Sequence, residues 1–320
     1  MYKLLLVPAF CLVQLFCSAR TILVTNKSEL YAAEKNAVPG DTIVLKNGEW
    51  KDVQLKLNCQ GTAAQPVCFL AEKAGKVVFT GQSRLEIGGS YVQAEGFLFT
   101  NGFAGKEAVI TFRSSKDKLA NHCRVTNCAI DGFNNPGRME ENYWIAFYGK
   151  NNRLDHCSFR DKLNLGVLLA VILDDERSRE NFHSIDHNYF GRRIPLASNG
   201  GEMIRVGVSQ HCEFNSNTII ADNFFEQCDG ETEIVSIKSC RNEVKDNVFK
   251  EIHRVLKPGG HFSISDIVLE GELPAKWREV AELYAGCISG AIQKGEYLGI
   301  VEEAGFKNIT LQKNKPIIKR

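Results

Sequence analysis

The chain has 320 residues, of which 44% are hydrophobic and 24% are charged, so it can bury a sizeable core as one large domain or as two. Its formal net charge of +1 at pH 7 excludes a global electrostatic attraction to nucleic acid or to an acidic polymer. We therefore expect no nucleic-acid partner, and any anionic partner must be held by a local site.

Residues 1–19 have the pattern of an export signal. Lys3 precedes a largely apolar run at residues 4–16, and the small residues Ser18 and Ala19 follow. The run is too short to span a bilayer comfortably, so we expect no stable membrane insertion. The alternative is a buried N-terminal strand. Export would make the protein secreted or periplasmic.

Residues 20–250 show almost no helical periodicity. The exception is Lys27–Asn36, which predicts a short amphipathic helix. Pro39 and Gly40 then mark a turn before a predicted first strand at Thr42–Leu45. A helix at this position would cover the exposed end of a repeating β-structure.

A four-residue pattern recurs from residue 95 to residue 249: a polar residue, a small residue or Asn, any residue, and a large apolar residue. Its copies are Glu95–Leu98, Asn127–Ile130, His156–Phe159, His187–Phe190, Asp222–Phe225 and Asp246–Phe249. The spacing, roughly 25 to 35 residues, suits one coil of a solenoid, and such coils must stack because none buries its apolar face alone. The sequence therefore predicts an all-β, right-handed parallel β-helix over residues 20–250, truncated at its C-terminal end.

The recurring Asn and Cys residues of this pattern predict ladders of stacked side chains inside the turns. The chain has 11 cysteines and no CxxC pair, which indicates neither a zinc site nor a complete disulfide framework. Cys128 and Cys157 lie at apolar-patterned positions, where a small buried hydrophobe suffices.

After residue 250 the pattern changes. Residues 261–269 are typical of a strand, and residues 275–285 and 294–304 are typical of amphipathic helices. The four-residue pattern does not return. The sequence therefore predicts a separate, short α/β segment over residues 251–320.

Two segments carry candidate chemistry, residues 199–205 and 229–238. Glu231 and Glu233 are two residues apart, so on a strand they would share one face, where like charges are unfavourable unless a cation lies between them. Asn199 lies about one coil earlier and could stack beside Glu231. Two carboxylates and an amide oxygen are ligands suited to Ca²⁺. The alternative is an exposed acidic strand edge.

Lys238 follows five residues after Glu233. On a straight strand it would face away from the two glutamates, so we expect a bend near Ser236. A lysine beside a divalent cation releases its proton more readily, which suits a general base. The alternative is a solvated surface lysine.

These segments resemble a known family. Residues 230–239 (Gly-Glu-Thr-Glu-Ile-Val-Ser-Ile-Lys-Ser) are similar to the active-site signature of polysaccharide lyase family 6, which includes alginate lyases and chondroitinase B. Residues 199–205 (Asn-Gly-Gly-Glu-Met-Ile-Arg) and 187–192 (His-Asn-Tyr-Phe-Gly-Arg) are also similar, and the resemblance spans residues 20–251. It implies β-elimination on a uronate polymer, with alginate as the first substrate and chondroitin or dermatan sulfate as the second.

The resemblance also implies residue roles. It assigns the calcium ligands to Asn199, Glu231 and Glu233, the general base to Lys238, and the lining of the substrate groove to Arg205 and Arg192. Calcium would neutralise the C5 carboxylate and so lower the energy of a carbanion-like transition state. Lys238 would take the C5 proton, and an acid would protonate the departing glycosidic oxygen.

The chain departs from this family at the acid. The family's catalytic Arg lies on the next coil, where this sequence has Gly259, and the nearby Arg254 lies in a helical pattern. We therefore expect an impaired lyase. The alternative is a catalytically inactive solenoid that binds uronate polysaccharide.

Residues 248–320 resemble the C-terminal part of an arsenite methyltransferase. Cys287 matches an arsenic-binding thiolate of that family, but the glycine-rich loop for the cofactor and the partner cysteine are missing, so a small buried hydrophobe is the simpler interpretation of Cys287. A methyltransferase-related protein is the weakest alternative. Residues 248–251 fit both families, so we hypothesise a chimera joined at this stretch.

Overall fold

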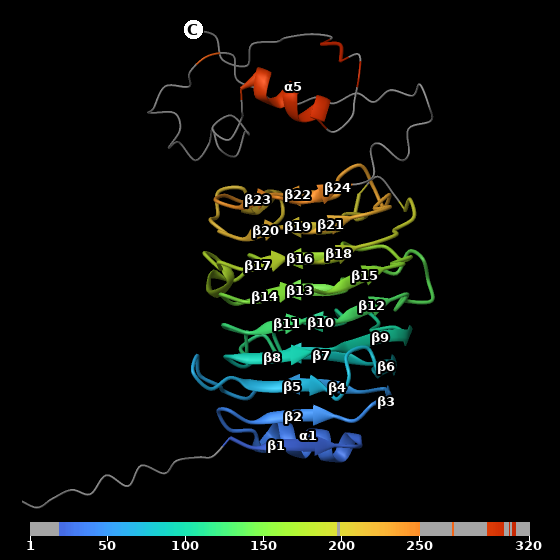
Figure 1. Cartoon of the computed structure of the whole chain (residues 1–320), viewed down its shortest axis with the longest axis vertical. Helices are drawn as coiled ribbons and strands as arrows, with labels where there is room; N and C mark the ends of the chain where they lie inside the picture. Colours follow the sequence, from blue (N-terminus) through green and yellow to red (C-terminus); the bar gives the residue numbers. More distant parts are fainter. Residues whose placement is uncertain are drawn as a thin grey trace, which may run out of the picture.

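The computed structural model describes residues 19–196, 199–249, 271, 293–303, 307 and 309–311. The described strands form three parallel sheets, with nine strands in sheet A, eight in sheet B and seven in sheet C. Each complete coil contributes one strand to A, then to B, then to C, and successive coils stack along the long axis of the molecule (Figure 1). The described part of the chain is a parallel β-helix, as predicted.

The strands of each sheet follow in the order in which they pair. Sheet A consists of β1 (Thr21–Val24), β2 (Thr42–Leu45), β5 (Val67–Ala71), β8 (Val92–Glu95), β11 (Arg124–Thr126), β14 (Arg153–Asp155), β17 (Ser184–Asp186), β20 (Ile219–Ala221) and β23 (Glu243–Lys245). Sheet B consists of β3 (Gly48–Lys51), β6 (Val77–Gly81), β9 (Phe97–Gly102), β12 (Ala129–Asp131), β15 (Ser158–Arg160), β18 (Tyr189–Phe190), β21 (Phe224–Phe225) and β24 (Val248–Phe249). Sheet C consists of β4 (Gln54–Leu57), β7 (Arg84–Ile87), β10 (Ile110–Thr111), β13 (Ile145–Phe147), β16 (Leu169–Val171), β19 (Ile204–Val206) and β22 (Val235–Ile237).

The helix α1 (Lys27–Asn36) forms where the sequence predicts it and covers the N-terminal end of the solenoid (Figure 1). The Asn26 side chain caps it by accepting a hydrogen bond from the Glu29 amide. The prediction that Thr42–Leu45 is the first strand is wrong. β1 precedes it and pairs with it, because the chain already lies extended directly after Ala19.

Apolar side chains stack in register inside the solenoid. Ile130, Phe159, Phe190, Phe225 and Phe249 occupy equivalent places on successive strands of sheet B. The ring centroids of Phe190 and Phe225 are 4.8 Å apart, and those of Phe225 and Phe249 are 4.6 Å apart. This stack accounts for the large apolar residue that ends each copy of the repeat.

The first copy of the repeat is shifted by one residue from the prediction. Ile130 pairs with Phe99, not with Leu98, so Gly96 is the residue equivalent to Asn127. Both have a positive φ, +82° at Gly96 and +50° at Asn127, a conformation that glycine and asparagine adopt readily.

The predicted ladders of Cys and Asn are present in the turns between sheets A and B. The Cys157 amide donates to Asn188 Oδ1 at 2.9 Å, and the Asn188 amide donates to Asn223 Oδ1 at 3.0 Å. Asn223 Nδ2 continues the ladder to Asn247 Oδ1 at 2.9 Å. Cys128 and Cys157 are each only 2% exposed, which confirms the interpretation of both as small buried residues.

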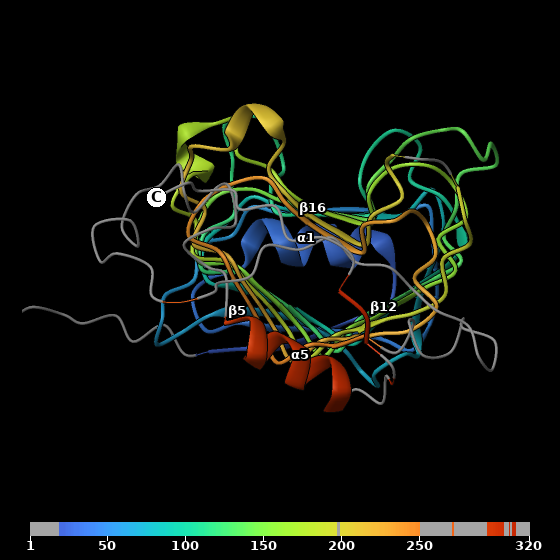
Figure 2. The same ribbon diagram turned by 90° about the horizontal axis from the view of Figure 1, so that it is seen from above.

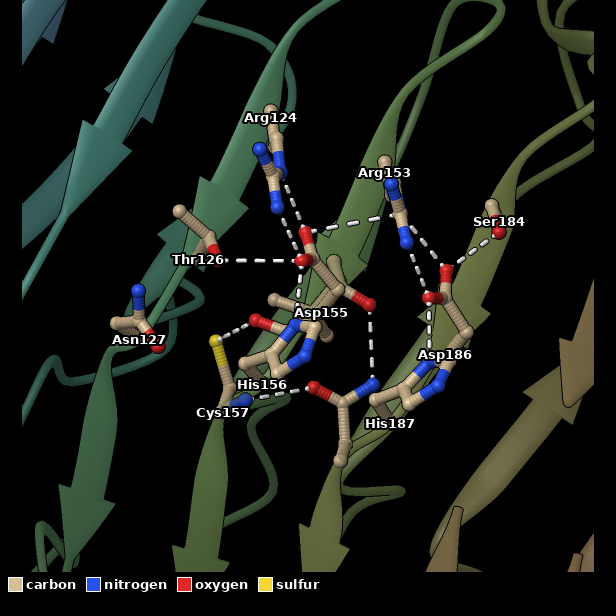
Figure 3. Close-up of polar contacts among 12 residues, drawn as sticks. Arg124, Thr126, Asn127, Arg153, Asp155, His156, Cys157, Ser184, Asp186 and His187 are labelled. Carbon is tan, nitrogen blue, oxygen red and sulfur yellow. Dashed lines mark hydrogen bonds and ion pairs between the residues drawn. The ribbon is translucent and has the colours of Figure 1, made fainter. Parts of the chain in front are cut away.

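An ion-pair ladder runs across the outer surface of sheet A beside these turns (Figure 3). Arg153 holds Asp186 through Nε at 2.9 Å and Nη2 at 2.6 Å, and the His187 ring lies 2.9 Å from the same carboxylate. The coil before repeats the arrangement with Arg124, Asp155 and His156, and the two imidazole rings stack 5.1 Å apart.

Asp186 should make folding stability depend on pH. Burial raises the pKa of this carboxyl, but hydrogen bonds from Arg153, Ser184 and His187 outweigh burial and lower the pKa to about 2. Because the folded pKa lies below the unfolded one, the stabilisation is complete above about pH 4 and is lost as the pH falls towards 2. We expect Asp186→Asn to lower the free energy of unfolding by about 1 kcal/mol at pH 7 and by almost nothing at pH 2.

Denaturant titrations at the two pH values check this prediction. Asp131→Asn is the control, because its ion pair with Arg160 is more exposed and should contribute less. A loss that is equally large at pH 2 would show that the asparagine disturbs packing and not charge.

The predictions for the two ends of the chain are tested only in part. The helix α5 (Lys294–Glu303) forms within the predicted helix at residues 294–304. The predicted signal peptide, apart from Ala19, lies outside the described residues, as do the strand at 261–269 and the helix at 275–285. Among the described residues no helix is both long and apolar enough to cross a membrane.

Candidate functional site

Loops rise on both sides of sheet C and frame its outer face (Figure 2). The side chains that point outward there form one row in register, which we call the outer row of sheet C. It consists of Glu86, Thr111, Ala146, Ala170, Arg205 and Ser236. The alternate residues of the same strands point into the core. The candidate residues lie at the C-terminal end of this row and in the turns that lead into it.

The candidate calcium ligands lie in two successive turns between sheets B and C, and these turns are adjacent. Residues 199–202 form part of the first turn and residues 229–233 part of the second, and the Gly201 amide donates to Glu231 Oε2 at 2.8 Å. The backbones approach so closely that a Cβ on Gly230 would lie 2.2 Å from the Gly201 carbonyl oxygen. The turn that carries Asn199 is therefore adjacent to the turn that carries Glu231.

The expectation that Glu231 and Glu233 share a strand face is wrong. β22 begins only at Val235, so both glutamates lie in the turn before it. Glu231 is half-buried, whereas Glu233 and Asn199 are exposed.

Negative charge accumulates at this pair of turns. The pKa of Glu231 is raised, first by burial and then by the charges of Glu202 and Glu233, against the Gly201 amide and Arg193, which lower it. Glu202 is fully buried, and neither of its carboxylate oxygens accepts a hydrogen bond from a described residue. Its nearest ion-pair partner is Arg205, with Nη1 3.9 Å from Oε1. A buried carboxylate that accepts no hydrogen bond is unfavourable, and a bound cation would relieve this.

The turns do not form a closed metal cage. Within the described residues, no three His, Cys, Asp or Glu side chains converge on a common point. The donor set of Asn199, Glu231 and Glu233 nevertheless fits Ca²⁺, which takes carboxylate and amide oxygens and completes its shell with water or ligand oxygens. Glu202 was not singled out in the sequence, because its burial depends on contacts between coils.

Lys238 directly follows β22, and its amide donates to the Val206 carbonyl at 2.8 Å. The predicted bend near Ser236 is wrong, because Ser236 lies within the strand and pairs with Arg205. Ser236 and Lys238 are two residues apart and so share the outward face of sheet C. Lys238 therefore lies just beyond the pair formed by Arg205 and Ser236, and no bend is needed because the glutamates are not on the strand.

Arg205 points outward from β19 towards the loops that frame sheet C. Its Nη2 donates to the Tyr143 hydroxyl at 3.1 Å, and its guanidinium carbon lies 5.9 Å from the centre of that ring. A second pair lies on the same face, where the Arg113 guanidinium covers the Tyr148 ring at 3.9 Å. Sequence patterns gave no signal for Tyr143, Tyr148 or Arg113.

The remaining candidates lie elsewhere. Arg192 lies in the turn after β18, largely exposed, and its Nη1 pairs with Asp161 at 2.7 Å on the preceding coil. The structure therefore does not bring it to the outer row of sheet C. Gly259, Arg254 and Cys287 lie outside the described residues.

Comparisons with known proteins agree with this architecture. The family model described as chondroitinase B matches residues 24–266. The solved structure of the PL6 (polysaccharide lyase family 6) alginate lyase AlyGC has a TM-score of 0.69 and 42% identity, over 71% of this chain and 31% of that one. A mannuronic acid specific family 6 lyase from human gut microbiota has a TM-score of 0.67 and 37% identity, over 71% of this chain and 53% of that one.

A third structure, the PL6 polysaccharide lyase Pedsa3628 from Pseudopedobacter saltans, has a TM-score of 0.64 and 35% identity, over 71% of this chain and 52% of that one. The chain thus spans about a third to about half of the length of these lyases. Arsenite methyltransferases of Aquipseudomonas alcaligenes and Halobacterium salinarum are 33% identical over 73 and 67 residues, which is 23% and 21% of this chain and 21% and 17% of theirs.

Proposed function

The chain belongs to the chondroitinase B family, and from this premise we propose that it is a calcium-dependent polysaccharide lyase that cleaves uronate polymers, alginate first, by β-elimination. The observation that supports the proposal is that β22, which Lys238 directly follows, pairs with β19, which carries Arg205, and that both strands follow the acidic turns. A polyanionic substrate needs such local positive charge, because the net charge of the chain is only +1.

Each residue has a distinct role in the proposal. Asn199, Glu231 and Glu233 would hold calcium, which when bound supplies positive charge to neutralise the uronate C5 carboxylate. Lys238 accepts the proton from C5 as the C4–O bond breaks, which leaves a 4,5-unsaturated uronate at the new non-reducing end. Arg205, held by Tyr143, pairs with a substrate carboxylate.

The chain lacks the arginine that is expected to protonate the leaving oxygen. By the resemblance to polysaccharide lyase family 6, Gly259 stands where that family has its catalytic arginine, so we propose that turnover is impaired. This substitution also supports the second candidate function, an inactive solenoid that binds uronate chains. Arg192 remains a candidate substrate contact only if the polymer extends beyond the outer row of sheet C.

The decisive experiment is the ultraviolet absorbance of unsaturated uronate during incubation with alginate, with and without a calcium chelator. Chondroitin and dermatan sulfate serve as the second substrates. We expect slow, chelator-sensitive product formation. The Gly259→Arg variant tests what is missing: a higher rate would point to the one side chain, and little change to the whole coil. Retention of the polymer without absorbance in either protein would establish the inactive binder instead.

Glu202 provides a test of the cation site that does not depend on turnover. We expect Glu202→Gln to raise the Tm in the presence of a chelator, because it removes a buried carboxylate without a hydrogen-bonding partner among the described residues. We also expect it to reduce the increase in Tm that calcium produces. Thermal denaturation with and without calcium measures both effects.

The matched control is Glu86→Gln, a buried glutamate of sheet C with Lys56 and Arg84 each 3.5 Å away. This control should not raise the Tm and should leave the calcium response intact. A Glu202→Gln protein with an unchanged calcium response would count against a cation site at these turns.

Two further proposals concern the origin of the chain. We propose export on the pattern of residues 1–19, which detection of the processed protein outside the cytosol would test. We also propose that the chain is a chimera joined at residues 248–251, since it matches both a lyase family and, over 73 residues, an arsenite methyltransferase. Single long sequencing reads across the locus test this; a lyase reading frame that continues through residue 251 would show that the junction arose by sequence misassembly and not by recombination.

A further inference from the structure

Arg193 is a fully buried arginine in the turn that follows β18. Its backbone forms a parallel bridge with Cys228 on the next coil. The Arg193 amide donates to the Gln227 carbonyl at 2.8 Å, and the Asp229 amide donates to the Arg193 carbonyl at 2.9 Å. The backbone of Arg193 is thus hydrogen-bonded to the start of the turn that carries Glu231.

The guanidinium group of Arg193 reaches the other acidic turn. Nη1 donates to the Glu202 carbonyl at 2.6 Å, and Nη2 donates to the Gly200 carbonyl at 3.3 Å and to the Gly166 carbonyl at 2.6 Å. Three carbonyls from two coils are therefore held by one planar group, and two of them flank Gly201, whose amide binds Glu231.

The second turn packs on the same side chain. A Cβ on Gly230 would lie 2.9 Å from Arg193 Cδ and Nε, so only glycine allows this approach. Both turns that carry candidate calcium ligands therefore rest on Arg193, one through hydrogen bonds and one through packing.

The charge of Arg193 acts against a cation site. Burial lowers its pKa to about 10, although the charges of Glu202 and Glu231 oppose this, so the group is a cation at neutral pH. A buried cation near a calcium ion repels it. Any benefit of Arg193 to metal binding must therefore come from the order that it imposes on the turns. Its charge should weaken calcium binding and its ordering effect should strengthen it, so the two effects can be separated.

We propose that Arg193 is a positioning residue that fixes the turns at residues 199–202 and 229–233 in the arrangement that binds calcium. The proposal rests on the proposed function, because it presupposes that these turns are the cation site. Groups that orient metal ligands typically contribute roughly 10- to 100-fold to metal affinity. Lysine would keep the charge but could not span the three carbonyls.

The first test is the calcium dissociation constant of the full chain, measured by titration calorimetry. We expect calcium to bind roughly 10- to 100-fold more weakly to both Arg193→Lys and Arg193→Met. Asn188→Ala is the control, since it removes another buried, hydrogen-bonded side chain in a turn between sheets A and B. It should lower the Tm without changing the Kd. Unchanged or tighter binding in either Arg193 variant would overturn the proposal.

The second test is independent of calcium. Hydrogen exchange of the Gly201 amide, measured in a chelator, should be faster in Arg193→Lys than in the wild type and in Asn188→Ala. An unchanged rate overturns the positioning role. If the wild-type chain binds no calcium at all, the proposed function fails, and the exchange rate still decides whether Arg193 orders these turns.

Discussion

Replacing Lys238 by methionine should lower the rate of β-elimination by about 10²- to 10⁴-fold, the range expected for the loss of a general base. Lys238 is the lysine that follows β22 on the outward face of sheet C, next in line to Ser236 and Arg205. Methionine keeps most of the side-chain volume, so calcium binding and folding should remain. The ultraviolet absorbance of unsaturated uronate measures the rate.

The control for this variant is Lys245→Met. Lys245 lies on β23 in sheet A, exposed and paired with Glu243 at 2.9 Å, away from the outer row of sheet C. Its replacement should leave the rate unchanged. Equal rates in the two methionine variants would exclude Lys238 as the base.

Truncating Phe190 to alanine should lower the free energy of unfolding by about 3–5 kcal/mol. Phe190 is 0% exposed, and it lies between Phe159 and Phe225 in the aromatic stack of sheet B. Its removal leaves a cavity that neighbouring coils cannot fill, because ladder hydrogen bonds fix their spacing.

Phe249→Ala is the matched control for Phe190→Ala. Phe249 is the last described ring of the same stack but is 41% exposed, so its truncation should have a clearly smaller effect. Denaturant titrations of the two variants provide the comparison. Equal losses of stability would mean that position in the stack does not determine the contribution of a ring.

The solenoid could be predicted from the sequence because its repeat is local. Each copy places its own apolar residue and its own turn residue, as at His187 and Phe190, and stacking then aligns the copies. The first copy of the repeat is placed one residue too early for the same reason, because only its local pattern is considered. Glu95 and Gly96 satisfy a polar-then-small pattern, whereas the structure requires a residue at Gly96 that tolerates a positive φ.

The site could be predicted only as far as its motifs extend along the chain. The motifs singled out Asn199, Glu231 and Lys238 as candidates, but they misjudged where β22 begins, because alternation alone does not mark the end of a turn. The contacts of Arg193 and of Tyr143 join different coils. Tyr143 and Arg205 are 62 residues apart in sequence, and no local pattern records such a pair.

The stacking of coils also determines where the molecule opens first. Each coil is stabilised by its neighbours, so fraying at an end of a solenoid disrupts one interface, whereas opening in the middle disrupts two. β22 is the terminal described strand of sheet C; it follows Glu231 and ends just before Lys238. An ion held jointly by Glu231 and Asn199 would act as a clasp between two successive coils, so that calcium would both complete the site and resist the separation of these coils.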